Sequence, residues 1–283
     1  MTVLCPRTLG EALDALEQHP DATVLAGGTD LMVAINAGRL RPEVVISIAG
    51  VEELHRWSTD GVVATIGSTM TYTRLLHSGV AELSPGLFQA SRTVGSPQIR
   101  NGGTIGGNLA TGSPAGDTLP VLAALDATVT LTSRSDQRTL PVTEFIIGPK
   151  RTALSTGELI TAVTIPVAAG PQEYLKVGVR AAMVIAMVSI ALVVDTPNRR
   201  VAVALGAAGP VPIRASDAEA WVADHIDWDA GAHGSPDVAA TFGQMVADAS
   251  RPIDDHRGTA EYRRHALGVL ARRALGRSFA SAP

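Results

Sequence analysis

The sequence predicts an α+β protein made of two small α/β units followed by a C-terminal α+β domain. Short β-type runs and amphipathic helices share the earlier part of the chain, and helical patterns dominate its end. Apolar residues make up 46% of the 283 residues and charged residues 18%, which provides ample apolar material for a buried core. We place the three units at residues 1–57, 58–171 and 172–283.

The first unit combines one helix with two β-type runs. Thr8 and Glu11 have the spacing of a capping box, which predicts a helix over residues 9–19. A short β-type run over 22–26 ends at a glycine pair, and a second run covers residues 43–48. This order predicts a small α/β unit.

The second unit contains several predicted strands around a glycine-dense segment. Asp60 and Gly61 form a turn signal that leads into a strand over 62–67. The runs 127–132 and 138–142 flank a polar turn, which predicts a β-hairpin. A further strand over 160–165 is closed by a proline.

The third unit follows a linker at 168–172 and begins with strands over 187–194 and 200–205. Helices then dominate, and the last residues, 278–283, are predicted to fray. Each of three helices has a start signal: the capping-box spacing of Ser216 and Glu219, the proline of Ser235-Pro236, and Thr259. The inner face of the last helix is predicted to hold Tyr262, Ala266, Leu267, Leu270 and Leu275.

Charge and cysteine content exclude several classes of protein. The net charge of −4 lacks the basic surplus that binding to nucleic acid requires. The single cysteine, Cys5, allows no internal disulfide, and this chain alone cannot hold an iron–sulfur cluster or a cysteine-rich zinc site. The N-terminus lacks a signal-peptide pattern, and the apolar stretch 181–194 is too short to span a bilayer. These observations predict a cytoplasmic protein without a membrane span.

Two glycine segments, 26–30 and 102–108, are the strongest candidates for a binding site. Glycine leaves no Cβ to block a ligand, and consecutive amides in such turns form a concave nest for anions such as phosphate. Two nests could hold a diphosphate from both sides; the alternative interpretation is that the glycines only make tight turns. Neither the P-loop pattern nor the Rossmann fingerprint occurs in the chain.

The same segments resemble a known family. The runs are Val24-Leu-Ala-Gly-Gly-Thr-Asp-Leu31 and QIRNGGTIGGNLATGSPAGD over residues 98–117, supported by segments 150–154, 157–161 and 255–265. They are similar to the FAD-binding medium subunits of molybdenum hydroxylases, the xanthine dehydrogenase and carbon monoxide dehydrogenase group. The resemblance implies a PCMH-type FAD-binding fold of the vanillyl-alcohol-oxidase kind. In it, two α/β subdomains hold FAD, and a C-terminal domain of the carbon monoxide dehydrogenase flavoprotein type covers it.

The resemblance also implies which residues bind the cofactor. The first diphosphate segment would be Val24, Leu25, Ala26, Gly27, Gly28, Thr29, Asp30 and Leu31. The second would be Gly103, Thr104, Ile105, Gly106, Gly107 and Asn108, with Gly67, Ser68 and Thr69 in a loop close to FAD. Four further residues are implied as contacts, namely Ser113, Asp117, Ile160 and Lys176.

Three of these assignments carry a specific role or an alternative. Asp117 would accept hydrogen bonds from a cofactor hydroxyl, and Lys176 would favour anionic reduced flavin. Asp30 and Asp117 could instead cap turns, and Lys176 could be an ordinary surface lysine. Where the family commonly has an aspartate near the flavin ring, this chain has Val184 followed by Ile185, which leaves the electron acceptor open.

The resemblance implies a subunit of a larger enzyme. Its partners would be a large molybdopterin subunit and a small subunit with 2Fe–2S clusters, assembled as a dimer of heterotrimers. Electrons would pass through the clusters to FAD and then to an external acceptor such as NAD, oxygen or a quinone. No residue of this chain need act on the substrate itself. The C-terminal stretch 251–283, with seven arginines and three acidic residues, could be a solvated face or could dock a partner.

Two other functions remain open from the sequence. A stand-alone flavin reductase or oxidase of the same fold would need its own substrate pocket and proton donor, for which no convincing candidate is present. A flavin-free phosphate-binding or assembly module would bind no FAD.

Overall fold

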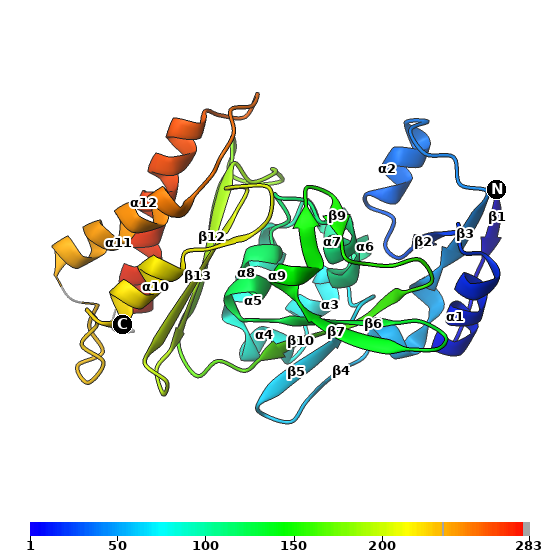
Figure 1. Cartoon of the computed structure of the whole chain (residues 1–283), viewed down its shortest axis with the longest axis horizontal. Helices are drawn as coiled ribbons and strands as arrows, with labels where there is room; N and C mark the ends of the chain where they lie inside the picture. The colour runs from blue at the N-terminus through cyan, green and yellow to red at the C-terminus, as the bar shows by residue number, and fades with distance from the viewer. Residues whose placement is uncertain (234, 280–283) are drawn as a thin grey trace.

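The computed structural model describes residues 1–233 and 235–279. Its elements follow one another in a row from an N-terminal unit at one end to a layer of C-terminal helices at the other (Figure 1). Helices and strands are mixed throughout, which confirms the predicted α+β class. Of the predicted frayed end, residues 280–283 lie outside the described residues, and Ser278 is the last residue of a helix.

The N-terminal sheet has three parallel strands in the order β1-β3-β2. These strands are β1 (Thr2–Leu4), β2 (Thr23–Leu25) and β3 (Val44–Ser47). Helix α1 (Leu9–Gln18) begins as predicted, because the Thr8 hydroxyl accepts a hydrogen bond from the Glu11 N–H. Helix α2 (Leu31–Asn36) buries none of its side chains, and the turns η1 (Ile48–Gly50) and η2 (Glu52–His55) lead out of this unit.

The central sheet is antiparallel and has the strand order β4-β5-β10-β6-β7. Its strands are β4 (Trp57–Thr59), β5 (Val63–Gly67), β6 (Thr128–Thr132), β7 (Gln137–Pro141) and β10 (Leu159–Pro166). The predicted hairpin is confirmed as β6 and β7. Strand β4 begins at Trp57, so the residues on both sides of the boundary placed at 57/58 belong to one strand.

Seven short helices accompany the central sheet. They are α3 (Tyr72–Leu76), α4 (Val80–Leu83), α5 (Pro85–Thr93), α6 (Pro97–Gly102), α7 (Ile105–Thr111), α8 (Leu119–Ala124) and α9 (Val142–Phe145). A two-stranded ribbon of β8 (Ile146–Gly148) and β9 (Arg151–Thr152) follows α9. The sequence did not predict the helices between residues 72 and 124, where glycine and short apolar runs obscure a helical period.

The C-terminal sheet is antiparallel, in the order β11-β12-β13-β14. Its strands are β11 (Gln172–Val177), β12 (Val188–Asp195), β13 (Arg200–Gly206) and β14 (Ile213–Arg214). Helices α10 (Ser216–Ala223), α11 (Pro236–Ala249) and α12 (Ala260–Ser278) form a layer beyond it (Figure 1). The side chains that alternate along β12 and β13 therefore pack against two different layers.

This sheet joins two hydrophobic cores. Ala191, Val193, Ala202 and Ala204 pack on the side of α5 and α8, in one cluster with the central sheet. Side chains of the alternate positions, such as Ile190, pack against α10, α11 and α12 in a second cluster. Apolar packing therefore continues across residue 172, so the central and C-terminal parts share one interior.

Two details of the C-terminal helices differ from the prediction. Tyr262 is 48% exposed, and the neighbouring Arg263 is buried in its place. The guanidinium of Arg263 donates to the Met187 carbonyl at 2.8 Å and to Asp255 Oδ1 at 2.6 Å, which compensates for its burial. Ser216 is the first residue of α10 rather than its cap, and the Glu219 N–H donates to the Ala215 carbonyl. The Glu219 carboxylate accepts from Arg214 and from the Val203 N–H.

The described part of the chain has neither a membrane-spanning helix nor a cluster of metal-ligating side chains. Among the helices of residues 1–233 and 235–279, none combines the length and the apolar composition that a membrane span requires. The same residues contain no group of His, Cys, Asp and Glu side chains that could hold a metal ion.

Candidate functional site

The two glycine segments lie against each other, although the first follows β2 of the N-terminal sheet and the second connects α6 to α7 of the central unit. A Cβ on Gly27 would overlap the main-chain carbonyl of Gly102, so only glycine allows this approach. In the other direction, a Cβ on Gly102 would lie 3.1 Å from the Gly27 oxygen and 3.4 Å from Thr29 Cγ2. We call segments 26–30 and 102–108 together the glycine junction.

The first segment of the junction offers unused hydrogen-bond donors. Val24 and Leu25 end β2, Ala26 follows, and Leu31 begins α2. Gly28 has φ +73°, a left-handed conformation that favours glycine. Within the described residues, no main-chain amide from Gly27 to Asp30 donates a hydrogen bond to the protein. The Asp30 side chain forms no cap at α2, so the turn-cap alternative is wrong for this residue.

The second segment differs from the predicted turn, because it is the beginning of a helix. Gly103 precedes Thr104, whose hydroxyl caps α7 by accepting from the Gly107 N–H at 3.0 Å. The amides of Ile105 and Gly106 donate to the carbonyls of Met70 and Ser68. Three consecutive amides of the predicted nest are therefore already bonded within the protein, and this segment contributes close backbone approach rather than a row of free donors.

The loop Gly67, Ser68 and Thr69 lies directly beneath the second segment. A Cβ on Gly106 would lie 2.6 Å from Ser68 Cβ, so this helix start needs glycine to reach the loop. Ser68 is buried, and its hydroxyl oxygen has no hydrogen-bond partner among the described residues. The Thr69 hydroxyl lies 3.0 Å from His55 Nδ1, which ties the loop to the end of the N-terminal unit. The structure thus brings all three predicted segments together.

Asp117 and Lys176 form a buried ion pair at 2.8 Å, with 9% and 8% of their side chains exposed. Lys176 Nζ also donates to the Thr93 carbonyl at 3.2 Å, and Tyr174 Oη donates to the second carboxylate oxygen of Asp117 at 2.8 Å. The interpretation of Lys176 as a surface lysine is therefore wrong, and so is that of Asp117 as a turn cap. The pair joins the central unit to β11, and both carboxylate oxygens already hold a donor.

Burial controls the protonation of this cluster. It raises the pKa of Asp117, and the nearby Lys176 ammonium opposes that rise. Burial also raises the pKa of Tyr174, and the Asp117 charge raises it further. The phenol therefore keeps its proton and donates a hydrogen bond to Asp117. The pKa of Tyr72 is likewise raised by burial and, less strongly, by the charges of Asp117 and Asp30.

The remaining predicted residues lie around these groups. Asn108 in α7 accepts a hydrogen bond from the hydroxyl of Thr118 at 2.6 Å. Thr118 directly follows Asp117 in the chain, so this bond connects α7 to the segment that carries the ion pair. Ser113 stabilises the turn after α7, since its hydroxyl accepts from the Ala115 N–H. Ile160 is buried in the central core at the start of β10.

The sequence analysis did not identify Tyr174 as a residue of the site. Its position two residues before Lys176 on one strand places both side chains on the same face of the sheet.

The segment that departs from the family pattern is a turn between β11 and β12. Val184 packs against Gly178: a Cβ on Gly178 would overlap the methyl groups of Val184. Ile185 is 53% exposed, and Arg180 closes the turn by donating to the Met183 carbonyl. Val184 thus occupies the one position where the resemblance led us to expect an aspartate.

The junction fits the diphosphate of a dinucleotide at its first segment. The unused amides of residues 27–30 are donors that suit phosphate oxygens, and the glycines leave room for close approach. The unpartnered Ser68 hydroxyl adds one more polar group next to the second segment. The individual contacts to FAD stay predictions.

Comparison with protein families agrees with this arrangement. Residues 1–168 match the model of the FAD binding domain in molybdopterin dehydrogenase. Residues 173–278 match the model of the CO dehydrogenase flavoprotein C-terminal domain. The two matches meet between β10 and β11, where the central sheet gives way to the C-terminal sheet.

Similarity to individual proteins extends over nearly the whole chain. The glyceraldehyde dehydrogenase medium chain of Sulfolobus acidocaldarius is 32% identical over 95% of this chain and 94% of its own length. The nicotine 6-hydroxylase medium subunit of Paenarthrobacter nicotinovorans is 31% identical over 95% of this chain and 94% of its own. The structure of reconstituted CO dehydrogenase from Oligotropha carboxidovorans superimposes with a TM-score of 0.90 at 27% identity, covering 100% of this chain and 98% of that one. The chain therefore belongs to the FAD-binding subunits of the molybdenum hydroxylases, a family of oxidoreductase subunits.

Proposed function

We propose that this chain carries electrons within a molybdenum hydroxylase, from 2Fe–2S clusters on a small partner subunit to an acceptor outside the complex. A large molybdopterin subunit would oxidise the substrate, and the assembly would be a dimer of heterotrimers in the cytoplasm. When bound, FAD supplies the redox chemistry, accepting electrons from the clusters and releasing them to the acceptor. The role of this chain is to bind the cofactor, orient it and set its surroundings.

The observation that carries the proposal is the glycine junction. Gly27 and Gly102 touch through their backbones, and the amides of residues 27–30 have no partner within the described chain. A flavin dinucleotide needs a diphosphate site of this kind, and family membership supports FAD as its occupant. The single cysteine, Cys5, supports clusters on another subunit, because cluster ligation takes several thiolates.

The proposal is tested by FAD binding to the whole chain and to a junction variant. Gly102→Val puts a branched side chain where a Cβ alone is already 3.1 Å from the Gly27 oxygen, so it should separate the two segments. We expect wild-type protein to bind FAD and Gly102→Val to bind it at least about tenfold more weakly. Binding is measured by equilibrium dialysis and flavin absorbance.

Gly276→Val is the matched control, since a Cβ at Gly276 in α12 meets nothing within 4 Å. It should bind FAD like the wild type. Wild-type affinity in Gly102→Val would contradict the junction as the binding site. Purification through a tag on this chain from its own host should bring molybdenum and iron with it, and their absence would contradict the proposed partners.

A protein that oxidises or reduces a substrate alone would support the stand-alone flavoenzyme instead. A protein that takes up no FAD would support the flavin-free module. The proposed electron carrier should be reduced by its partner subunits and should show no turnover of substrate when separated from them.

A further inference from the structure

Strand β10 contains one extra residue, Thr161, next to the Ser68 loop of the candidate site. Ile160 pairs with Leu131 and Ala162 pairs with Thr130, so Thr161 has no partner of its own on β6. This is a β-bulge, which locally redirects the backbone of the strand that carries it. Pairing of β10 with β5 reaches Ala162 and Gly67. Ala162 immediately follows the bulge residue Thr161, and Gly67 immediately precedes Ser68.

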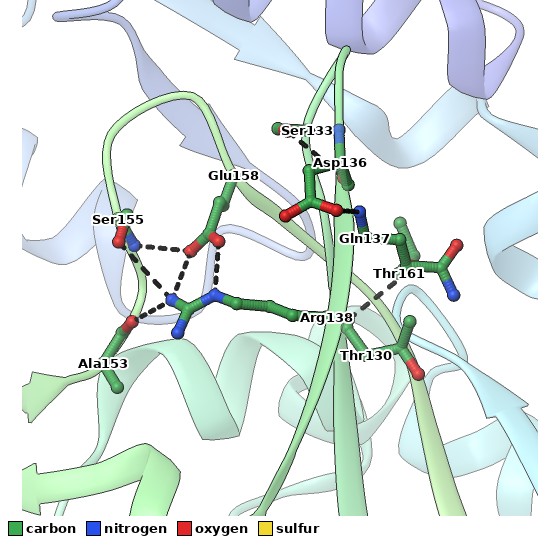
Figure 2. Close-up of polar contacts among 9 residues, drawn as sticks. All are labelled: Thr130, Ser133, Asp136, Gln137, Arg138, Ala153, Ser155, Glu158 and Thr161. Carbon is green, nitrogen blue, oxygen red and sulfur yellow. Dashed lines mark hydrogen bonds and ion pairs between the residues drawn. The ribbon is translucent and has the colours of Figure 1, made fainter.

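The bulge is held by the side chain of Thr161. Its hydroxyl lies 2.9 Å from the Thr132 hydroxyl and donates to the Thr130 carbonyl at 3.3 Å. The contact between Thr161 and Thr130 is visible at the right of Figure 2. We call the three residues Thr130, Thr132 and Thr161 the threonine clamp.

Two main-chain hydrogen bonds connect Thr161 to the glycine junction. The Thr161 carbonyl accepts from the Ser68 N–H at 3.1 Å, and the Ser68 carbonyl accepts from the Gly106 N–H at 2.9 Å. Ser68 is buried, and Gly106 approaches it so closely that no side chain fits between them. A shift of the Thr161 carbonyl is therefore passed to the start of α7 through two hydrogen bonds.

A second contact fixes the chain just before the bulge. Arg138 of β7 donates from Nε to Glu158 Oε1 at 2.6 Å and from Nη2 to Glu158 Oε2 at 2.8 Å (Figure 2). Arg138 also donates to the Ala153 carbonyl, and Glu158 accepts from the Ser155 N–H. The strand thus enters the bulge from an anchored position, which leaves the clamp to set where the Thr161 carbonyl points.

We propose that Thr161 is a positioning residue for FAD binding: its hydroxyl holds the bulge that places Ser68 and Gly106 at the glycine junction. The inference rests on the proposed function, because it takes FAD as the occupant of the junction. It assigns a task to a side chain whose hydrogen bonds go to Thr130 and Thr132 on the neighbouring strand. The clamp acts through geometry, since small displacements of a binding backbone are costly in affinity.

The test compares Thr161→Val with Thr161→Ser and with a control threonine. Valine keeps the shape and removes the hydroxyl, whereas serine keeps the hydroxyl. Thr164 is the matched control, because it lies on the same strand and its hydroxyl lies 3.3 Å from that of Thr65 on β5, away from the bulge. FAD affinity of each whole-chain variant is measured by equilibrium dialysis, together with its melting temperature without FAD.

We expect Thr161→Val to bind FAD about tenfold more weakly than the wild type, and Thr161→Ser to restore affinity to within about twofold. Thr164→Val should lower the melting temperature by a similar amount and keep wild-type affinity. The inference is overturned if Thr161→Val binds FAD normally, or if Thr164→Val weakens binding as much. Failure of the wild type to bind FAD would instead overturn the proposed function, and the inference with it.

Discussion

At the scale of single residues, the Asp117–Lys176 pair decides the electrostatics next to the candidate site. Burying two charges costs several kcal/mol each, and their attraction compensates only with good geometry and further hydrogen bonds. Tyr174 and the Thr93 carbonyl provide those further bonds. Lys176 is therefore half of a neutral pair, which reduces the positive charge that the resemblance implied for this position.

Removing one partner should expose the cost of burial. Lys176→Met leaves the Asp117 carboxylate buried with Tyr174 as its remaining donor, and we expect a loss of about 3 kcal/mol in unfolding free energy near neutral pH. The pKa of Asp117, already raised by burial, then rises further because the opposing ammonium is gone. The folded state takes up a proton before the unfolded state does, so the deficit should shrink as pH falls.

Urea denaturation of wild type and Lys176→Met at about pH 8 and about pH 5.5 measures this change. The double variant Asp117→Asn with Lys176→Met is the control, because it buries no unpaired charge. It should lose less stability than the single variant at the higher pH. An equal deficit for Lys176→Met at both pH values would contradict the account.

At the scale of elements, the loop between β9 and β10 depends on one bidentate ion pair. Arg138 holds Glu158, Ala153 and Ser155 together, as Figure 2 shows, and so connects the β6–β7 hairpin to the beginning of β10. Glu158 is the more buried partner, with 13% of its side chain exposed against 37% for Arg138. A bidentate pair of this kind stabilises more than an ordinary surface pair, because it fixes two donors at once.

The pair should contribute a stability that acid removes. The Arg138 guanidinium holds the pKa of Glu158 below its usual value. Burial opposes this shift by raising the pKa, and the hydrogen bond from the Ser155 N–H lowers it further. A lowered pKa means stability that is present above about pH 4.3, the pKa of an unfolded glutamate, and is lost as pH falls through the folded value. We expect Glu158→Gln to lose about 1 kcal/mol near pH 7, and the gap to the wild type to close toward about pH 3.

Chemical denaturation across that pH range gives the gap directly. Glu52→Gln is the control, because Glu52 and Arg56 are 82% and 74% exposed and their atoms lie 3.6 Å apart. Its stability should stay within about 0.5 kcal/mol of the wild type. A gap for Glu158→Gln that persists at low pH would show that the pair acts through packing rather than charge.

At the scale of the whole molecule, the junction is one of the contacts between the N-terminal unit and the central unit, while the central and C-terminal parts share an interior. Leu159 of β10 also packs into the N-terminal core, beside Ile46 and Leu54. A ligand bound at the junction contacts residues on both sides of it. Its binding energy therefore stabilises the arrangement of the units as well as each unit.

FAD should therefore raise the stability of the whole chain. A ligand at about 100 times its dissociation constant adds about 2.7 kcal/mol, which for a chain of this size is a rise of about 5 to 10 °C in melting temperature. Thermal unfolding with and without FAD measures it. FMN, which lacks the diphosphate bridge, should produce a much smaller rise at the same concentration, and an equal rise would contradict recognition through the diphosphate.

The sequence by itself determined the class of the fold, most strands and the segments that form the candidate site. Alternating apolar residues, turn signals and the Thr8 and Thr259 caps are local features, so they are visible along the chain. The glycine segments could also be recognised in the sequence, because a position where two backbones approach closely requires glycine.

Only the tertiary structure decided which groups of the site are available. The amides of residues 105–107 are taken by Met70, Ser68 and Thr104, whereas those of 27–30 are unused within the described chain. Lys176 is buried, and Arg263 takes the inward position predicted for Tyr262. The physical reason is that a donor or charge is satisfied by partners far away in sequence, such as Asp117 for Lys176, and local periodicity carries no information about them.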